Sequence, residues 1–317
     1  MNGELEVLNF EEPKKFSVLD TYGENLKTKF YLTDPAIGRD KEIKETLLIL
    51  LTPEKSAMLV GKPGIGKTAI VEGIGYRMQK GEVPDALKNY DLIKINISSL
   101  LGNVSSDGVN ENKLQILVDE LKERENIILF IDEVHLLVSR NTSNLNVDFA
   151  NMLKPGLDRG TIKMIGATTT EEYESYILRD RAFLRRFQKV DVMEPTIEDT
   201  VKILMGTYPK FEKKLGVKLA YSDFQKEKIF AFLTDMTSEY KRVYEVAARY
   251  PDITLTLLAN AFSYAVFENS KEVRIKHIYK AIENAKNIYD DAKKKALIAF
   301  KEEFKDMLEE ENVDLNA

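Results

Sequence analysis

The sequence of 317 residues contains no cysteine and only two histidines, His135 and His277. The lack of cysteine excludes disulfides and thiolate metal sites, and two histidines are too few for a histidine-rich metal site. No run approaches the roughly 18 apolar residues of a membrane span. The N-terminal stretch, MNGELEVLNFEEPKKF, also lacks the basic and then apolar segments of a secretion signal. These absences predict an intracellular, cytoplasmic protein that does not enter a membrane.

Acidic residues outnumber basic ones, 52 against 46, which gives a net charge of −6. This charge argues against broad electrostatic capture of nucleic acid, although a local basic surface stays open as an alternative. The composition, 44% hydrophobic and 31% charged, is typical of a soluble globular protein, and the length allows two domains.

Short apolar runs alternate with helical patterns between about residues 35 and 195. Such alternation predicts a parallel sheet covered by helices. One of the intervening helical patterns places Leu114, Leu117, Val118 and Leu121 on a single face, which we expect to be buried. The five expected strands are SAMLVG, DLIKINI, IILFID, IKMIGAT and FQKVDV.

Only helical patterns follow residue 195, where Thr196 and Asp199 resemble a helix N-terminal capping box. The tail predicts a last amphipathic helix, which packs either on its own domain or on a partner. Its apolar positions are Leu297, Phe300, Phe304, Met307 and Leu308.

The segment GKPGIGKT, residues 61–68, has the spacing of a phosphate-binding loop between a strand and a helix. Its glycines allow backbone N–H groups to turn toward phosphate oxygens, and the helix N-terminus adds partial positive charge. Lys67 is expected to reach the β- and γ-phosphates, and Thr68 to hold Mg²⁺. We predict ATP and Mg²⁺ here, with nucleotide contacts from Gly61, Lys62, Pro63, Gly64, Ile65, Gly66, Lys67, Thr68 and Ala69.

A second motif, IILFIDE, is a continuous apolar strand that ends in two carboxylates. We expect Asp132 to hold Mg²⁺ directly or through water, and Glu133 to polarise the attacking water. His135 is interpreted as structural rather than as a ligand. A third strand, IKMIGAT, ends in hydroxyl residues able to touch the γ-phosphate.

Arg185 and Arg186 stand just before the last expected strand. Phosphoryl transfer needs a cation that stabilises the charge of the transition state, and a neighbouring subunit often supplies it. The two arginines are therefore candidates for that role.

Together these motifs resemble the AAA+ module, and more narrowly the first ATPase module of Clp-type unfoldases and disaggregases. The likeness runs from about residue 17 to 290 through LDTYGENLKTKFYLTDPAIGRDKEI, GKPGIGKTAIVEGIGYRMQKGEVPDALK, ILFIDEVHLL, NMLKPGLDRGTIKMIGATTTEEYESYI and RRFQKV. It implies a three-layer αβα sandwich with a five-stranded parallel sheet, followed by a small all-α lid. It also implies that Ile37 and Gly38 line the adenine pocket, that Thr169 is the polar sensor, and that Arg185 and Arg186 are arginine fingers.

The resemblance also organises the chain and its assembly. Because arginine fingers act in trans, we expect a homo-oligomeric ring, taken to be a hexamer. We divide the chain into an N-terminal extension (1–34), a large nucleotide-binding α/β domain (35–195), a small helical lid (196–290) and a C-terminal helix and tail (291–317).

Three features depart from the family pattern. The aligned pore loop reads SSDG, with Ser106 where the family has the aromatic residue that grips threaded polypeptide. Ile253 stands where the family has a lysine near the nucleotide, although Arg249 is a candidate substitute. The sequence shows no second ATPase module, coiled-coil insertion or folded N-terminal domain.

Three functional hypotheses follow. The first is an ATPase ring that remodels a protein assembly, with an unidentified client or adaptor. The second is a nucleotide-dependent switch or scaffold that does not translocate polypeptide. The third is an accessory ATPase of a DNA-handling or mobile-element system, for which salt-dependent DNA binding is the discriminating observation.

Overall fold

The computed structural model describes residues 16–101, 109–138, 151–157, 159–244 and 249–313. Its sheet contains six strands in the order β1-β3-β4-β5-β2-β6. The five strands from β2 to β6 run parallel, and β1 pairs antiparallel with β3. The strands are β1 (Gly23–Asn25), β2 (Ser56–Val60), β3 (Asp91–Ile95), β4 (Ile127–Ile131), β5 (Lys163–Thr168) and β6 (Phe187–Asp191).

All five predicted parallel strands are present, but the predicted strand count was one too low. The additional strand, β1, has only three residues and no apolar alternation. It exists because its backbone pairs with the edge of β3, where Gly23 lies opposite Ile95 and Asn25 opposite Ile93. Such pairing is decided between backbones and leaves little trace in local sequence.

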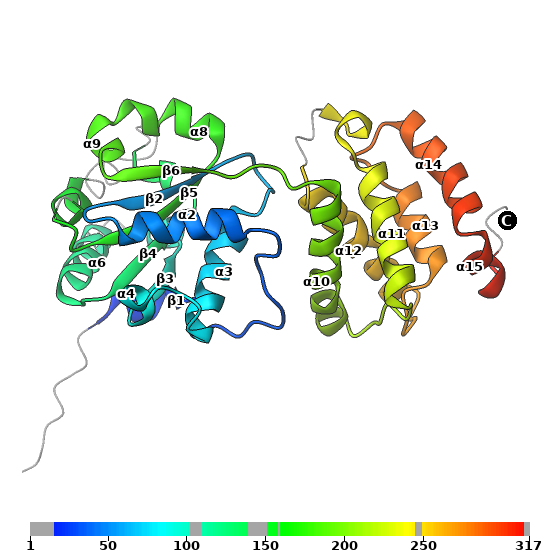
Figure 1. Ribbon diagram of the computed structural model, residues 1–317, viewed down its shortest axis with the longest axis horizontal. Helices are drawn as coiled ribbons and strands as arrows, with labels where there is room; N and C mark the ends of the chain where they lie inside the picture. The colour runs from blue at the N-terminus through cyan, green and yellow to red at the C-terminus, as the bar shows by residue number, and fades with distance from the viewer. Residues whose placement is uncertain (1–15, 102–108, 139–150, 158, 245–248, 314–317) are drawn as a thin grey trace, which may run out of the picture.

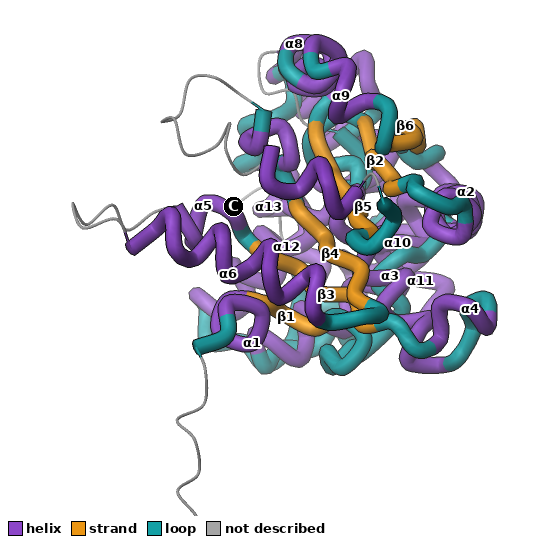
Figure 2. Tube along the Cα trace, turned by 90° about the vertical axis from the view of Figure 1, so that its left-hand side faces the viewer, coloured by secondary structure: helices purple, strands orange, loops and turns teal. Residues whose placement is uncertain are grey.

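Two hydrophobic cores cover the two faces of this sheet, as the period of two along each strand requires. In β4, Leu129 and Ile131 belong to the core under α1, α5 and α6, whereas Ile128 and Phe130 belong to the core under α2 and α3. Figure 2 shows the strands between these two groups of helices. The helices are α1 (Val18–Tyr22), α2 (Asp40–Leu51), α3 (Lys67–Lys80), α4 (Asp85–Lys88), α5 (Ile97–Leu101), α6 (Val109–Glu123), α8 (Thr170–Ser175) and α9 (Arg181–Leu184).

Helix α6 confirms the predicted buried face between two strands. Its four apolar positions at helical spacing are at most 3% exposed and all lie in the first core. The fold therefore matches the expected α/β sandwich, with β1 as an antiparallel addition at one edge.

The helical part begins after β6 and contains six helices, which Figure 1 shows as a separate group beside the sheet. Thr196 is the N-cap of α10, and its Oγ1 accepts a hydrogen bond from the Asp199 backbone N–H at 3.1 Å, as predicted. The helices are α10 (Ile197–Leu215), α11 (Asp223–Met236), α12 (Asp252–Phe267), α13 (Ile275–Glu283), α14 (Asp290–Glu303) and α15 (Lys305–Glu310).

The predicted last amphipathic helix is present as two helices, α14 and α15, which meet at Phe304. Phe300 and Phe304 are almost completely buried, and Met307 and Leu308 are 8% exposed. All four belong to the same core as α11, α12 and α13. Of the two alternatives left open, packing on its own domain is therefore the correct one.

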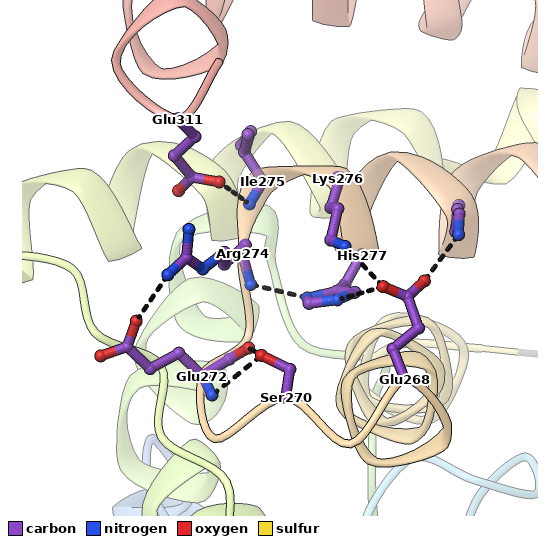
Figure 3. Close-up of polar contacts among 9 residues, drawn as sticks. Glu268, Ser270, Glu272, Arg274, Ile275, Lys276, His277 and Glu311 are labelled. Atoms are coloured by element: carbon purple, nitrogen blue, oxygen red, sulfur yellow. Dashed lines mark hydrogen bonds and ion pairs between the residues drawn. The ribbon is translucent and has the colours of Figure 1, made fainter. Parts of the chain in front are cut away.

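An ionic cluster around Glu268 joins the end of α12 to α13 (Figure 3). The Glu268 carboxylate accepts hydrogen bonds from Lys276 at 2.5 Å and Lys280 at 2.6 Å, and lies 3.3 Å from His277 Nε2. These bonds, chiefly those from Lys276 and Lys280, lower the pKa of Glu268 to about 2. His277 Nδ1 accepts from the Arg274 backbone N–H at 2.8 Å, so both ring nitrogens serve the start of α13.

Two searches of the described residues found nothing. No group of three or more histidine, aspartate or glutamate residues in this part of the chain is arranged to hold a metal ion. Within the same residues, no helix combines the length and apolar character that crossing a bilayer requires.

Candidate functional site

The predicted phosphate-binding loop connects β2 to α3 at the carboxyl end of the sheet. Gly66 is the N-cap of α3 and has φ +101°, a backbone conformation that a side chain would strain. Ile65, immediately before it, is 1% exposed and anchors the loop to the core. The loop therefore presents the N-terminus of a 14-residue helix to the space above the sheet.

Lys67 is folded back on this loop. Its ammonium donates hydrogen bonds to the carbonyl oxygens of Gly61 at 2.8 Å and Lys62 at 2.9 Å. Burial lowers the pKa of Lys67, and the nearby Asp132 only partly offsets that effect. An anion arriving at the loop would favour the charged ammonium.

The carboxylate pair stands at the end of β4, two strands away from β2 in the sheet. The Thr68 hydroxyl donates to Asp132 Oδ2 at 2.7 Å, and Asp132 Oδ1 accepts from the Glu133 backbone N–H at 3.1 Å. Glu133 has φ +54° and an exposed side chain. A non-glycine residue in this conformation costs roughly 1–2 kcal/mol, and such strain is concentrated at functional sites.

The end of β5, between β4 and β2, carries a polar cluster. Glu172 Oε2 accepts from the Thr169 backbone N–H at 3.0 Å and the Thr168 hydroxyl at 3.1 Å. The same oxygen lies 3.1 Å from Nδ1 of His135, which is 8% exposed. Burial raises the pKa of Glu172, but these hydrogen bonds and His135 outweigh it, so the pKa lies below its usual range.

Thr169 caps the next helix, α8. Its Oγ1 accepts from the Glu172 backbone N–H at 3.2 Å, which leaves the hydroxyl hydrogen available to a ligand. Sequence analysis named Thr169 but missed Glu172, although the spacing Thr-x-x-Glu is that of a capping box. His135 packs against the ring of Tyr176 in this cluster, as expected of a structural residue.

A cavity of about 330 Å³ brings the three motifs together. It is lined by Pro63, Gly64, Gly66, Lys67, Thr68, Asp132, Glu133, Thr168, Thr169 and Glu172. The other predicted loop residues, Gly61, Lys62, Ile65 and Ala69, lie beside the cavity in the loop and the first turn of α3.

Ile37 and Gly38 stand apart from these lining residues, at the contact between the start of α2 and the helical part. A Cβ built on Gly206 of α10 would lie 1.9 Å from Ile37 Cδ1, so only glycine fits there. The Thr33 hydroxyl donates to the Gly206 carbonyl at 2.8 Å. Gly38 has φ +73° and faces Asp199, in the first turn of α10.

The helical part also reaches the phosphate-binding loop itself. A Cβ built on Gly64 would lie 2.9 Å from the Cβ of Asp252, the first residue of α12. Burial raises the pKa of Asp252. Ile253, which replaces the expected lysine, is 2% exposed and belongs to the interior of the helical part.

Glu194, in the connection from β6 to α10, ties that connection to the segment before α12. Its Oε1 accepts from the Tyr250 backbone N–H at 2.7 Å and lies 2.6 Å from Arg242 Nη1. The Arg242 side chain is 3% exposed and donates through Nε to the Thr237 carbonyl at 2.6 Å. Arg249 lies 3.8 Å from the other oxygen of Glu194. No local sequence signal pointed to this cluster.

The predicted arginine fingers do not line the cavity of their own chain. They lie between α9 and β6, where the Arg185 side chain is exposed. The carbonyl oxygens of Arg185 and Arg186 accept from the Lys55 ammonium at 2.6 Å and the Ser56 backbone N–H at 2.9 Å. Ser106, in the aligned pore loop, lies outside the described residues.

Comparison with known proteins adds to this geometry. Residues 57–192 match the AAA family, described as the ATPase family associated with various cellular activities. The chain is 41% identical over 258 residues to the Clp protease ATP-binding subunit ClpE of Bacillus subtilis, covering 80% of this chain and 35% of ClpE. It is 35% identical over 325 residues to the chaperone ClpB of Enterococcus faecalis, covering 98% of this chain and 36% of ClpB.

Solved structures give the same relationship. A closed-state reconstruction of Hsp104 with ATPγS and FITC casein matches with a TM-score of 0.70 at 33% identity, over 84% of this chain and 45% of Hsp104. The S. cerevisiae Hsp104–ADP complex matches with a TM-score of 0.69 at 34% identity, over 83% of this chain and 44% of that chain. The chain thus spans about a third of the curated relatives and less than half of the solved structures.

Proposed function

Because this chain belongs to the AAA ATPases through residues 57–192, and its relatives are Clp-type chaperones, we propose that it hydrolyses Mg²⁺-ATP to remodel protein assemblies. One observation carries the proposal. The cavity at the carboxyl ends of β2, β4 and β5 combines a phosphate-binding loop, a carboxylate pair and a free hydroxyl donor. Ligands of parallel α/β sheets bind at this edge.

The residues of the cavity fit a nucleotide triphosphate and its metal ion. Lys67 would exchange the loop carbonyls for phosphate oxygens, and the loop N–H groups would hold the same oxygens. Thr68 and Asp132, 2.7 Å apart, would supply oxygen ligands to Mg²⁺. The bound ion would neutralise charge on the β- and γ-phosphates.

Two side chains would act on the attacking water and the γ-phosphate. Glu133 is exposed at the cavity edge and would orient the water and accept its proton. Thr169 would donate its hydroxyl hydrogen to the γ-phosphate, because its oxygen already accepts from Glu172. We assign the adenine contact to Ile37 and Gly38, between the α/β domain and the lid, and retain the division of the chain near residue 195.

The remaining catalytic charge would come from a second subunit. Arg185 and Arg186 do not line their own cavity, which favours action on the nucleotide of a neighbour in a homo-oligomeric ring, taken to be a hexamer. Hsp104 has been reconstructed with casein, which supports a protein as the client of this chain.

A second candidate function is a nucleotide-dependent switch or scaffold. The aligned pore loop, SSDG, offers no large apolar side chain at Ser106, whereas an aromatic ring offers on the order of 150–250 Å² of contact. Unfolding of a destabilised fluorescent protein by the wild type and by Ser106→Tyr separates the two functions. Unfolding by the tyrosine variant alone supports the switch, and robust unfolding by the wild type contradicts it.

Nucleotide binding and turnover test the proposal directly. Lys67→Ala should lose ATP binding by calorimetry, whereas Glu133→Gln should keep ATP and lose turnover. Lys62→Ala, whose side chain is exposed on the same loop, is the matched control. Absence of ATP binding by the wild type at micromolar concentration with Mg²⁺ would refute the proposal. Mass spectrometry of proteins retained by Glu133→Gln in ATP would identify the client.

A further inference from the structure

A second cavity, of about 510 Å³, lies outside the proposed nucleotide site and shares no lining residue with it. Residues 29–32, in the segment that leads from β1 to α2, form one wall together with Glu72 of α3. Lys210, Lys213 and Lys214 of α10 form the other. Figure 1 shows that segment on the side of the α/β domain that faces α10. We call this cavity the basic groove.

The charge of the groove is strongly one-sided. Its only carboxylate, Glu72, already accepts from the Lys29 ammonium at 2.9 Å, and Lys29 also pairs with Glu24. Among the residues that the structure describes, no carboxylate lies within 4.0 Å of the ammonium groups of the three α10 lysines. The groove therefore holds three uncompensated positive charges in a chain of net charge −6.

Lys210 distinguishes this surface from an ordinary solvated helix face. It is half-buried, and that burial lowers its pKa despite the more distant Glu72 and Asp34. Lys213 and Lys214 lie in the last turn of α10, where they favour the helix dipole. The dipole does not explain Lys210, one turn earlier, because a half-buried cation without a close carboxylate costs free energy. An anionic ligand would offset that cost.

The opposite wall adds an apolar contact surface. Phe30 is 74% exposed and Leu32 is 42% exposed, and the Lys213 ammonium lies 4.5 Å from the centre of the Phe30 ring. Between them, Tyr31 packs edge-on against Tyr76 and donates its hydroxyl to the Leu26 carbonyl at 3.0 Å. Because Tyr31 fixes this segment, Phe30 and Leu32 are presented by a rigid backbone, which lowers the entropy cost of binding.

We propose that the basic groove binds an acidic peptide segment of a partner protein, with its carboxylates on the α10 lysines and an apolar side chain on Phe30 and Leu32. A peptide fits better than nucleic acid for two reasons. The lining has no arginine, the residue best suited to phosphate, and it contains the carboxylate of Glu72. The negative net charge of the chain also disfavours a polyanion.

Fluorescence anisotropy tests the proposal without nucleotide, so its failure is distinguishable from failure of the ATPase. The probe is a fluorescein-labelled peptide, Glu-Leu-Glu-Glu-Phe-Glu-Glu-Leu-Glu, titrated with the full chain. We expect saturable binding that weakens with salt. The same peptide with lysine in place of glutamate should not bind, because only the charge pattern differs.

Matched substitutions locate the binding surface. Lys213→Glu with Lys214→Glu should weaken binding about tenfold or more. Lys294→Glu with Lys295→Glu, two adjacent exposed lysines of α14, should change binding less than about twofold. Phe30→Ala should weaken binding roughly fivefold, and Phe224→Ala, at a residue equally exposed on α11, should not.

Three outcomes would overturn the proposal: no saturable binding, equal losses in the α10 and α14 variants, or tighter binding of a fluorescein-labelled decathymidylate that the α10 variant abolishes. The last result would make the groove a nucleic-acid site. Unchanged melting temperatures of the variants show that the losses are local.

Discussion

The α/β domain and the helical lid differ in where they keep their interior polar groups. In the α/β domain, such groups gather at one edge of the sheet, where Thr68, Asp132 and Thr169 border an open cavity. In the lid, they are closed on each other. Thr237 and Thr254 share a hydrogen bond of 2.9 Å, and the buried Arg242 is satisfied by Glu194 and a carbonyl.

This difference separates polar groups kept for a ligand from polar groups kept for the fold. A buried polar group is tolerated only when it has partners, and the lid supplies them internally. The sheet edge instead leaves Lys67 on loop carbonyls and Glu133 exposed, so a ligand is needed to complete both. Substitutions should therefore affect turnover in the first region and stability in the second.

The largest effect should come from the charge that the α/β domain lends to a neighbour. Arg185→Ala with Arg186→Ala should leave ATP binding nearly intact and lower turnover about 10³-fold or more, since transition-state stabilisation is lost. The measurement is steady-state ATP hydrolysis beside calorimetry, with the exposed Arg179→Ala as control.

Mixing experiments sharpen that result. The doubly substituted subunit should poison wild-type protein when the two are combined, because each finger serves the next subunit. Full activity of the double variant, or activity in a demonstrated monomer, would contradict the trans arrangement.

The next effect should appear where the two regions meet. Glu194→Ala leaves the buried Arg242 without its carboxylate partner and should lower the free energy of unfolding by about 3 kcal/mol. Urea denaturation measures the change, with Glu198→Ala, at an exposed residue of α10, as control. A loss no larger than that of the control would show that the connection does not depend on this ion pair.

A smaller effect should follow from the polar cluster behind Thr169. Glu172→Gln keeps one acceptor oxygen but loses the second oxygen and the charge, so Thr169 should be held less accurately. We expect turnover to fall about tenfold while the melting temperature changes little. Glu174→Gln, two residues along and exposed, serves as control. Equal turnover in both variants would reduce Glu172 to a helix cap.

The smallest effect should belong to the ionic cluster of the lid. The pKa of Glu268 is lowered from 4.5 to about 2 by Lys276 and Lys280, so its stabilising charge is present above about pH 4.5 and lost as pH falls toward 2. Glu268→Gln should therefore lower stability by about 1 kcal/mol or less at pH 7, and the difference from wild type should vanish toward pH 2.

Melting curves across that pH range measure the difference, with the exposed Glu302→Gln of α14 as control. A deficit that persists unchanged at low pH would mean that packing, and not charge, is responsible.

The sequence by itself determined the parts of this protein in which neighbours along the chain do the work. The loop from Gly61 to Thr68 and the strand ending at Asp132 and Glu133 are continuous segments, so spacing and apolar pattern were sufficient to predict them. The same holds for the five parallel strands and the buried face of α6.

Only the tertiary structure decided the contacts between segments far apart in the chain. β1 exists because β3 offers a backbone edge, and Glu194 meets Tyr250 across 56 positions. Thr33 and Gly206, separated by 173 positions, hold together the two walls that form the basic groove. Such pairings leave no period in the local sequence, because they depend on how the completed domains pack against each other.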